Sequence, residues 1–151
     1  MTIHLVTNLS SKTMKAIEFK YNDGGRSKYY AAEGVKDCVT RAIAIATARD
    51  YKEVYDLISG VLGYSPRNGI KTRHVHKVMA LFGGVWVPRM QIGSGCKCHL
   101  RANEIPMTGR IVCNVSKHVC AVVDGVLNDT HDCSRRGERC VYGYWVFDSK
   151  K

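Results

Sequence analysis

The chain has 151 residues, of which 45% are hydrophobic and 24% are charged, a composition that excludes a mostly disordered or low-complexity protein. A chain of this length buries about 70% of its unfolded surface, so we expect one domain over residues 1–151. No apolar run approaches the roughly 18 residues of a membrane-spanning helix, and no Lys or Arg precedes the apolar stretch at the amino end. We therefore expect a soluble, cytoplasmic protein with no membrane contact.

The net charge of +10 comes from 23 basic and 13 acidic side chains and is unevenly distributed. Between Leu57 and Val123 there is one acidic residue, Glu104, among nine basic ones: Arg67, Lys71, Arg73, Lys77, Arg89, Lys97, Arg101, Arg110 and Lys117. Such a segment attracts nucleic acid or an acidic protein through its field and through counterion release. Charge alone does not select between these partners.

Seven cysteines cannot all pair within one monomer, so we expect mostly free thiols, as in a reducing cytosol. Two alternatives stay open. One is an oxidised pair among four residues, Cys96, Cys98, Cys133 and Cys140. The other is a structural zinc site that draws on His99 and on Cys96, Cys98, Cys113, Cys120, Cys133 and Cys140. The absence of any Cys-x-x-Cys pair weighs against zinc, and no metal or cofactor is expected.

Two short strands are predicted first, Ile3 to Thr7 and Ala16 to Tyr21. Three helices follow: Val39 to Ala48, the segment between Asp50 and Gly63, and Ile70 to Phe82. The second helix has a capping box, because Glu53 comes three residues after the N-cap Asp50. The rest of the chain predicts strands at Val85 to Gln91, Arg110 to Val115, His118 to Val123, Val126 to Thr130 and Cys140 to Phe147. Helices followed by an antiparallel sheet indicate the α+β class.

The clearest hairpin centres on Asp124-Gly125, a pair that suits the positive φ angles of a two-residue turn. If Val123 opposes Val126, the register continues so that His118, Cys120 and Asp129 project from one face. A carboxylate is then placed to orient an imidazole. A three-residue turn would bring Asn128 to that face instead.

Cys38 is predicted at the first turn of a helix, where free backbone N–H groups and the helix dipole favour a thiolate. A neighbouring imidazolium would lower its pKa further and complete a nucleophile–base pair.

Three segments together resemble a group of small, bacteriophage-encoded papain-like cysteine peptidases. They are Gly34-Val-Lys-Asp-Cys38-Val-Thr-Arg-Ala-Ile-Ala-Ile-Ala-Thr47, Asp50-Tyr-Lys-Glu-Val-Tyr55 and His118-Val-Cys-Ala-Val-Val-Asp-Gly-Val-Leu-Asn-Asp-Thr130. The resemblance implies a papain-like fold, with a helical layer on an antiparallel sheet. It also implies Cys38 as nucleophile, His118 as general base and Asp129 as the residue that holds the imidazole.

The chain departs from the family pattern in one respect. Papain-like enzymes usually place a Gln a few residues before the nucleophile to help stabilise the oxyanion, and Lys28 to Asp37 contains no Gln or Asn. The backbone N–H of Cys38, assisted by Tyr29, Tyr30 or Lys36, is expected to take that role.

The expected function is cysteine-dependent cleavage of a peptide, isopeptide or related amide bond, with transfer to an amine as a variant of the same chemistry. The substrate would be a protein or peptide. For a phage-encoded enzyme, as the resemblance implies, it would be a protein of the host cell. The alternative is a catalytically inactive papain-like scaffold that binds an acidic host protein or nucleic acid through its basic surface.

Overall fold

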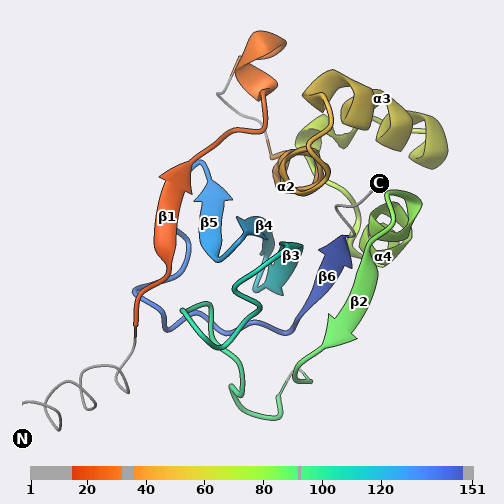
Figure 1. Cartoon of the computed structure of the whole chain (residues 1–151). Coiled ribbons are helices and arrows are strands. Elements are labelled where there is room, and N and C mark those ends of the chain that lie inside the picture. Colours follow the sequence, from red (N-terminus) through yellow and green to blue (C-terminus); the bar gives the residue numbers. More distant parts are fainter. Residues whose placement is uncertain (1–14, 32–35, 92, 148–151) are drawn as a thin grey trace, which may run out of the picture.

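A computed structural model describes residues 15–31, 36–91 and 93–147 (Figure 1). These residues contain three α-helices and six strands, which confirms the α+β class. The helices are α2 (Cys38–Thr47), α3 (Tyr51–Leu62) and α4 (Thr72–Leu81), and short 3-10 turns form η1 (Arg26–Lys28) and η2 (Pro66–Asn68). The strands are β1 (Glu18–Tyr21), β2 (Val85–Pro88), β3 (Arg110–Val115), β4 (His118–Val123), β5 (Val126–Asp129) and β6 (Gly143–Phe147). The strand predicted at Ile3 to Thr7 lies outside the described residues.

The six strands form one sheet in the order β1-β5-β4-β3-β6-β2. The prediction of a wholly antiparallel sheet is wrong, because β1 pairs with β5 in parallel and makes the sheet mixed. Alternating side chains indicate a strand but carry no information about its partner or direction. All four residues of β1 are exposed, as suits a strand at the edge of a sheet.

The hairpin of β4 and β5 has the predicted register, with Val123 opposite Val126 and Ala121 opposite Asn128. Asp124 and Gly125 adopt φ angles of 49° and 80°, so both turn residues are left-handed. This is the two-residue turn that matches the twist of the paired strands.

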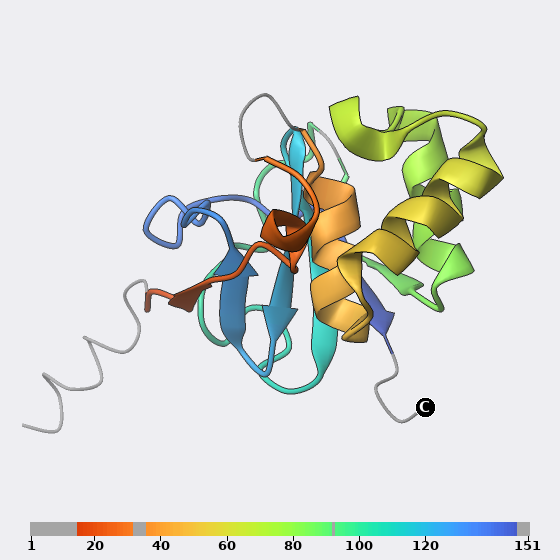
Figure 2. The same ribbon diagram turned by 90° about the horizontal axis from the view of Figure 1, so that it is seen from above.

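The three helices cover one face of the sheet, and irregular segments cover the other (Figure 2). Helix α2 packs directly on the strands, and its residues Val39 to Ala46 are all buried. The core on the helical side includes the buried ring of Trp145. On the other face, a second core gathers Leu100, Ile105 and Val141 from the loops against the strands. The central strands are therefore buried on both faces, which explains why β3 and β4 are almost continuously apolar.

Local sequence determines where the helices start and stop. The carboxylate of Asp50 accepts the backbone N–H of Glu53 at 3.3 Å, as the capping box predicts. Gly63 ends α3 with a left-handed φ of 78°. At the carboxyl end of α2, the guanidinium of Arg110 donates to the carbonyl of Ile45 at 3.1 Å. Among the described residues, no helix has the length and apolar character needed to cross a membrane.

Candidate active site

Cys38 begins α2, His118 begins β4 and Asp129 ends β5. Because β4 and β5 are antiparallel, the start of one and the end of the other lie at the same end of the sheet, away from the Asp124-Gly125 turn. Cys38 and His118 line the same groove at this end of the sheet, and the imidazole lies close enough to lower the pKa of the thiol. His118, 80 positions after Cys38, therefore lies beside the thiol, and Asp129 lies on the other side of the His118 ring.

A short hydrogen bond holds the imidazole, with His118 Nε2 2.7 Å from Asp129 Oδ2. The side chains of His118 and Asp129 are only 13% and 4% exposed. Since Nε2 faces the carboxylate, Nδ1 is the ring nitrogen left to face the thiol. Asn128 lies on the other face of the sheet, where it accepts from the side chain of Asn22 at 3.0 Å.

The electrostatics of the group favour its charged form. Burial opposes ionisation of Cys38, but the hydrogen bond and charge of His118, aided by Arg41, outweigh it and lower the pKa of the thiol. Burial likewise opposes charge on His118, yet the hydrogen bonds to Asp129, Cys133 and Cys38 raise its pKa to about 11. The pKa of Asp129 is lowered, because His118 overcomes the effect of burial. These shifts favour an imidazolium near neutral pH, held by the Asp129 carboxylate, and they make the Cys38 thiol easier to ionise than an ordinary thiol.

A buried ionic network continues from this group. The carboxylate of Asp37 accepts from Arg26 at 3.0 Å, from Arg41 and from the hydroxyl of Tyr51. Arg41 also donates to Asp129 Oδ1 at 3.3 Å. Opposite charges thus alternate from Arg26 to the imidazole, and each buried charge has a partner.

The same network affects the start of α2. Asp37 occupies the N-cap position, but its side chain makes no capping hydrogen bond because it is directed to the arginines and Tyr51. The first-turn N–H groups of α2, which begin at Cys38, have no intrahelical acceptor. They are therefore available to a negatively charged oxygen beside the thiol.

A groove of about 450 Å³ opens beside Cys38 and His118. Its walls are the start of α2, the segment from η2 into α4, the β3–β4 turn and Trp145 of β6. Sequence reasoning missed two amide side chains in its lining, Asn68 and Asn114. Asn114 could have been found from the β3–β4 pairing, which sets it opposite Val119, next to His118.

Lys36 also lines the groove, as expected for an oxyanion donor, but the two tyrosines proposed beside it do not. The hydroxyl of Tyr29 donates to Asp50 at 2.7 Å, and the ring of Tyr30 packs against Tyr55. The tyrosine part of that prediction is wrong, because the aromatic cluster at the start of α3 engages both rings.

Buried thiols lie behind the imidazole. Cys120, expected on the face of His118, is 1% exposed. The sulfur of Cys133 lies within 4.8 Å of a ring nitrogen of His118. Cys113 stands opposite Cys120 on β3. A neighbouring thiol, Cys113 for Cys120 and Cys120 for Cys133, together with burial raises the pKa of both cysteines, which disfavours their thiolate forms.

The remaining cysteines differ from the expectation of mostly free thiols in one pair. Cys96 and Cys140 form a disulfide, whereas Cys38, Cys98, Cys113, Cys120 and Cys133 are free. This pair is one of the combinations that the sequence left open. A seven-cysteine count cannot reveal it, because the contact requires a loop to reach the segment before β6.

The basic segment is partly used inside the protein. Arg101 donates to the carbonyl of Gly137 at 2.8 Å, and Arg110 caps α2. Six others are exposed: Lys71, Arg73, Lys77, Arg89, Lys97 and Lys117. Arg73 and Lys77, one turn apart, give α4 an exposed positive face.

Comparisons of this chain with protein-family models, with curated protein sequences and with solved structures find no match.

Proposed function

We propose that this protein is a cysteine-dependent hydrolase with a papain-like arrangement, which cleaves a peptide, isopeptide or related amide bond. The observation that carries the proposal is geometric: Cys38 and His118 line one groove, and the Asp129 carboxylate holds the His118 ring at 2.7 Å. A thiol of lowered pKa, at a helix start and beside an open groove, has the features of an activated nucleophile.

In the proposed reaction, the thiolate of Cys38 attacks the carbonyl carbon of the substrate. His118, protonated in the resting pair, donates its proton to the leaving amine, and a thioester forms. His118 then accepts a proton from water, which attacks the thioester and releases the acid. Asp129 keeps the ring oriented and stabilises its charge throughout, as the third group of such triads does. An amine in place of water would give acyl transfer. No cofactor takes part in these steps.

The negative charge that develops on the carbonyl oxygen needs hydrogen-bond donors. The uncapped N–H groups at the start of α2 supply them, and Asn68 or Asn114 in the groove wall can replace the missing Gln. Two exposed lysines, Lys36 and Lys117, also line the groove. Their charge favours a substrate with acidic residues near the cleaved bond.

Alkylation of Cys38 by iodoacetamide at pH 6 tests the proposal, because only the thiolate reacts. We expect Cys38 to be labelled faster than glutathione in the same tube, with the site identified by mass spectrometry of the peptides. Cys38→Ala should abolish cleavage of a peptide-amide library, whereas Cys98→Ala, which changes a free thiol outside the groove, should leave it unchanged. Equal labelling of Cys38 and glutathione would remove the basis for the enzyme.

A second function is favoured by the exposed positive face of α4. In this alternative, a catalytically inactive scaffold with the same fold binds an acidic host protein or nucleic acid. Retention on heparin that falls steeply with salt, and that Arg73→Ala with Lys77→Ala removes, would support binding. If Cys38→Ala kept the biological effect while the α4 variant lost it, binding would replace hydrolysis as the function.

A further inference from the structure

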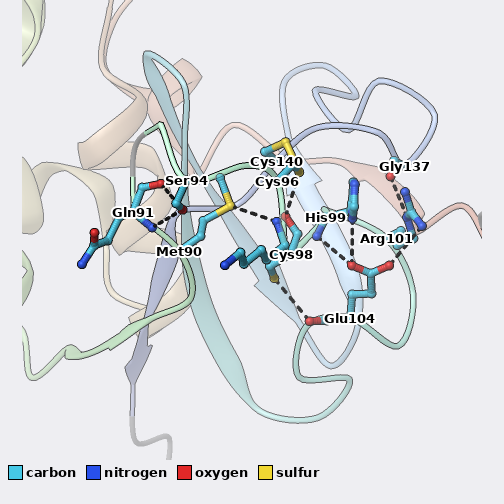
Figure 3. The surroundings of a disulfide bond; sticks show 11 residues. Met90, Gln91, Ser94, Cys96, Cys98, His99, Arg101, Glu104, Gly137 and Cys140 are labelled. Atoms are coloured by element: carbon cyan, nitrogen blue, oxygen red, sulfur yellow. Dashed lines mark hydrogen bonds and ion pairs between the residues drawn. A yellow bond between two sulfur atoms is a disulfide. The ribbon is translucent and has the colours of Figure 1, made fainter.

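A second group of cysteine, histidine and carboxylate side chains lies outside the groove, around the disulfide (Figure 3). Cys96 and His99 belong to the loop between β2 and β3, and Cys140 precedes β6. An isolated β-bridge pairs His99 with Cys140 and so aligns the two segments. The disulfide joins positions 44 residues apart.

The ligand atoms of Cys96, His99 and Cys140 all lie within 4.8 Å of one another. Cys96 is exposed, and the other two are partly buried, so both a reductant and a metal ion can reach the sulfurs. Two sulfurs and an imidazole nitrogen at this spacing are the ligand types and the approximate separation of a tetrahedral zinc site.

Glu104 prepares the imidazole for such a role. Its Oε1 lies 2.9 Å from His99 Nδ1 and also accepts the backbone N–H of His99 at 2.9 Å. The other oxygen of Glu104 pairs with Arg101 at 3.0 Å. The carboxylate thus fixes the ring and leaves Nε2 as the nitrogen for a metal. A carboxylate on the second nitrogen is the usual support of a zinc-bound histidine.

We infer that reduction of the disulfide converts this group into a zinc site formed by Cys96, His99 and Cys140, with water as the fourth ligand. A dithiol reductant breaks the S–S bond and becomes a disulfide itself, so two electrons and two protons pass to the sulfurs. Each cysteine then releases its proton as its thiolate binds Zn²⁺. Two thiolates and one imidazole select zinc over the hard cations Mg²⁺ and Ca²⁺.

Cys98 does not supply the fourth ligand. Its side chain is almost fully buried, and its thiol donates to the backbone carbonyl of Glu104 at 3.5 Å. The site therefore replaces one crosslink by another between the same two segments. Under oxidising conditions the link is covalent, and under reducing conditions zinc maintains it.

Cobalt titration of the full chain tests the inference, because Co²⁺ in a thiolate site absorbs strongly through sulfur-to-metal charge transfer. The protein is reduced, freed of reductant and titrated without oxygen. We expect one equivalent of Co²⁺ to bind, Zn²⁺ to displace it, and the oxidised protein to bind none at this site. His99→Ala should weaken binding by more than about 100-fold, and Glu104→Gln by about 10–100-fold.

Cys133→Ser is the matched control, since Cys133 belongs to the other metal-ligand group, with His118 and Asp129. It should leave the cobalt complex intact. As a second measurement that does not require variants, zinc should protect Cys96 and Cys140 of the reduced protein from alkylation while Cys38 stays reactive. The inference is overturned if reduced protein forms no stoichiometric complex. It is also overturned if Cys133→Ser removes the complex while His99→Ala keeps it, or if zinc leaves Cys96 and Cys140 unprotected.

Discussion

Two groups of cysteine, histidine and carboxylate lie in this protein, and their surroundings give them different chemistry. In each, a carboxylate holds the imidazole, at 2.7 Å between Asp129 and His118 and at 2.9 Å between Glu104 and His99. Asp129 is 4% exposed and Glu104 31%. Where the group is buried and linked to further charges, the thiols of Cys38 and Cys133 lie beside the imidazole and stay free. Where it is open to solvent, Cys96 and Cys140 face each other and form a disulfide. The two groups therefore differ in burial and in whether their cysteines are paired.

The largest expected effect is the loss of the buried charge network. Asp37→Asn leaves Arg26 and Arg41 without their shared carboxylate, so we expect the free energy of unfolding to fall by about 3–5 kcal/mol. Urea denaturation measures it. The same substitution in the exposed pair of Lys52 and Asp56, Asp56→Asn, should cost less than about 1 kcal/mol. Equal effects of the two variants would mean that the buried network stabilises the fold no more than an exposed ion pair does.

Removing the imidazole from the buried group should have the next largest effect. In His118→Ala the burial that raises the pKa of Cys38 is no longer opposed by an imidazolium. An ordinary thiol is about 0.3% ionised at pH 6, so we expect alkylation of Cys38 to slow by about 10²–10³-fold.

The dependence of the Cys38 alkylation rate on pH shows in which direction His118 shifts the pKa of the thiol. In the wild type, alkylation should persist below the usual range of thiols and fall only as the pH drops through the lowered pKa of Cys38. In His118→Ala the profile should move above the range of an ordinary thiol. His99→Ala is the control and should leave the profile unchanged, whereas a shift there would contradict the separation of the two groups.

Removing the disulfide between Cys96 and Cys140 should lower the free energy of unfolding by somewhat less than Asp37→Asn does. Cys96→Ser removes a link across 44 residues, and we expect the free energy of unfolding to fall by about 2–4 kcal/mol. Urea denaturation with a metal chelator present measures the contribution of the disulfide without any contribution from zinc. Dithiothreitol should lower the stability of the wild type by a similar amount and leave Cys96→Ser unchanged. A wild type indifferent to reductant would show that the link contributes little.

The smallest effect is expected at the carboxylate of the exposed group. Glu104→Gln weakens the contacts to His99 and Arg101, both of which are partly exposed to solvent, so we expect a loss below about 1 kcal/mol. Thermal unfolding of the oxidised protein measures it. A loss as large as that of Asp37→Asn would contradict the view that burial separates the two groups.

Much of the fold could be predicted because its signals are local. The capping box at Asp50, the glycine that ends α3 and the Asp124-Gly125 turn each depend on residues a few positions apart. The hairpin register follows from that turn, and it predicted the pairing of His118 with Asp129 correctly. Cys38 at the start of a helix was likewise a local prediction, and α2 begins there.

The sequence by itself determined the helices, the strands and the imidazole–carboxylate pair, because short-range hydrogen bonding and side-chain periodicity depend on neighbouring residues. Only the tertiary structure decided the parallel pairing of β1, the ion pairs of Asp37 and the bond between Cys96 and Cys140. Each of these joins segments whose approach depends on how the sheet and its covering loops pack. The residues next to each partner in the sequence do not determine whether the two partners come within contact distance in the folded protein.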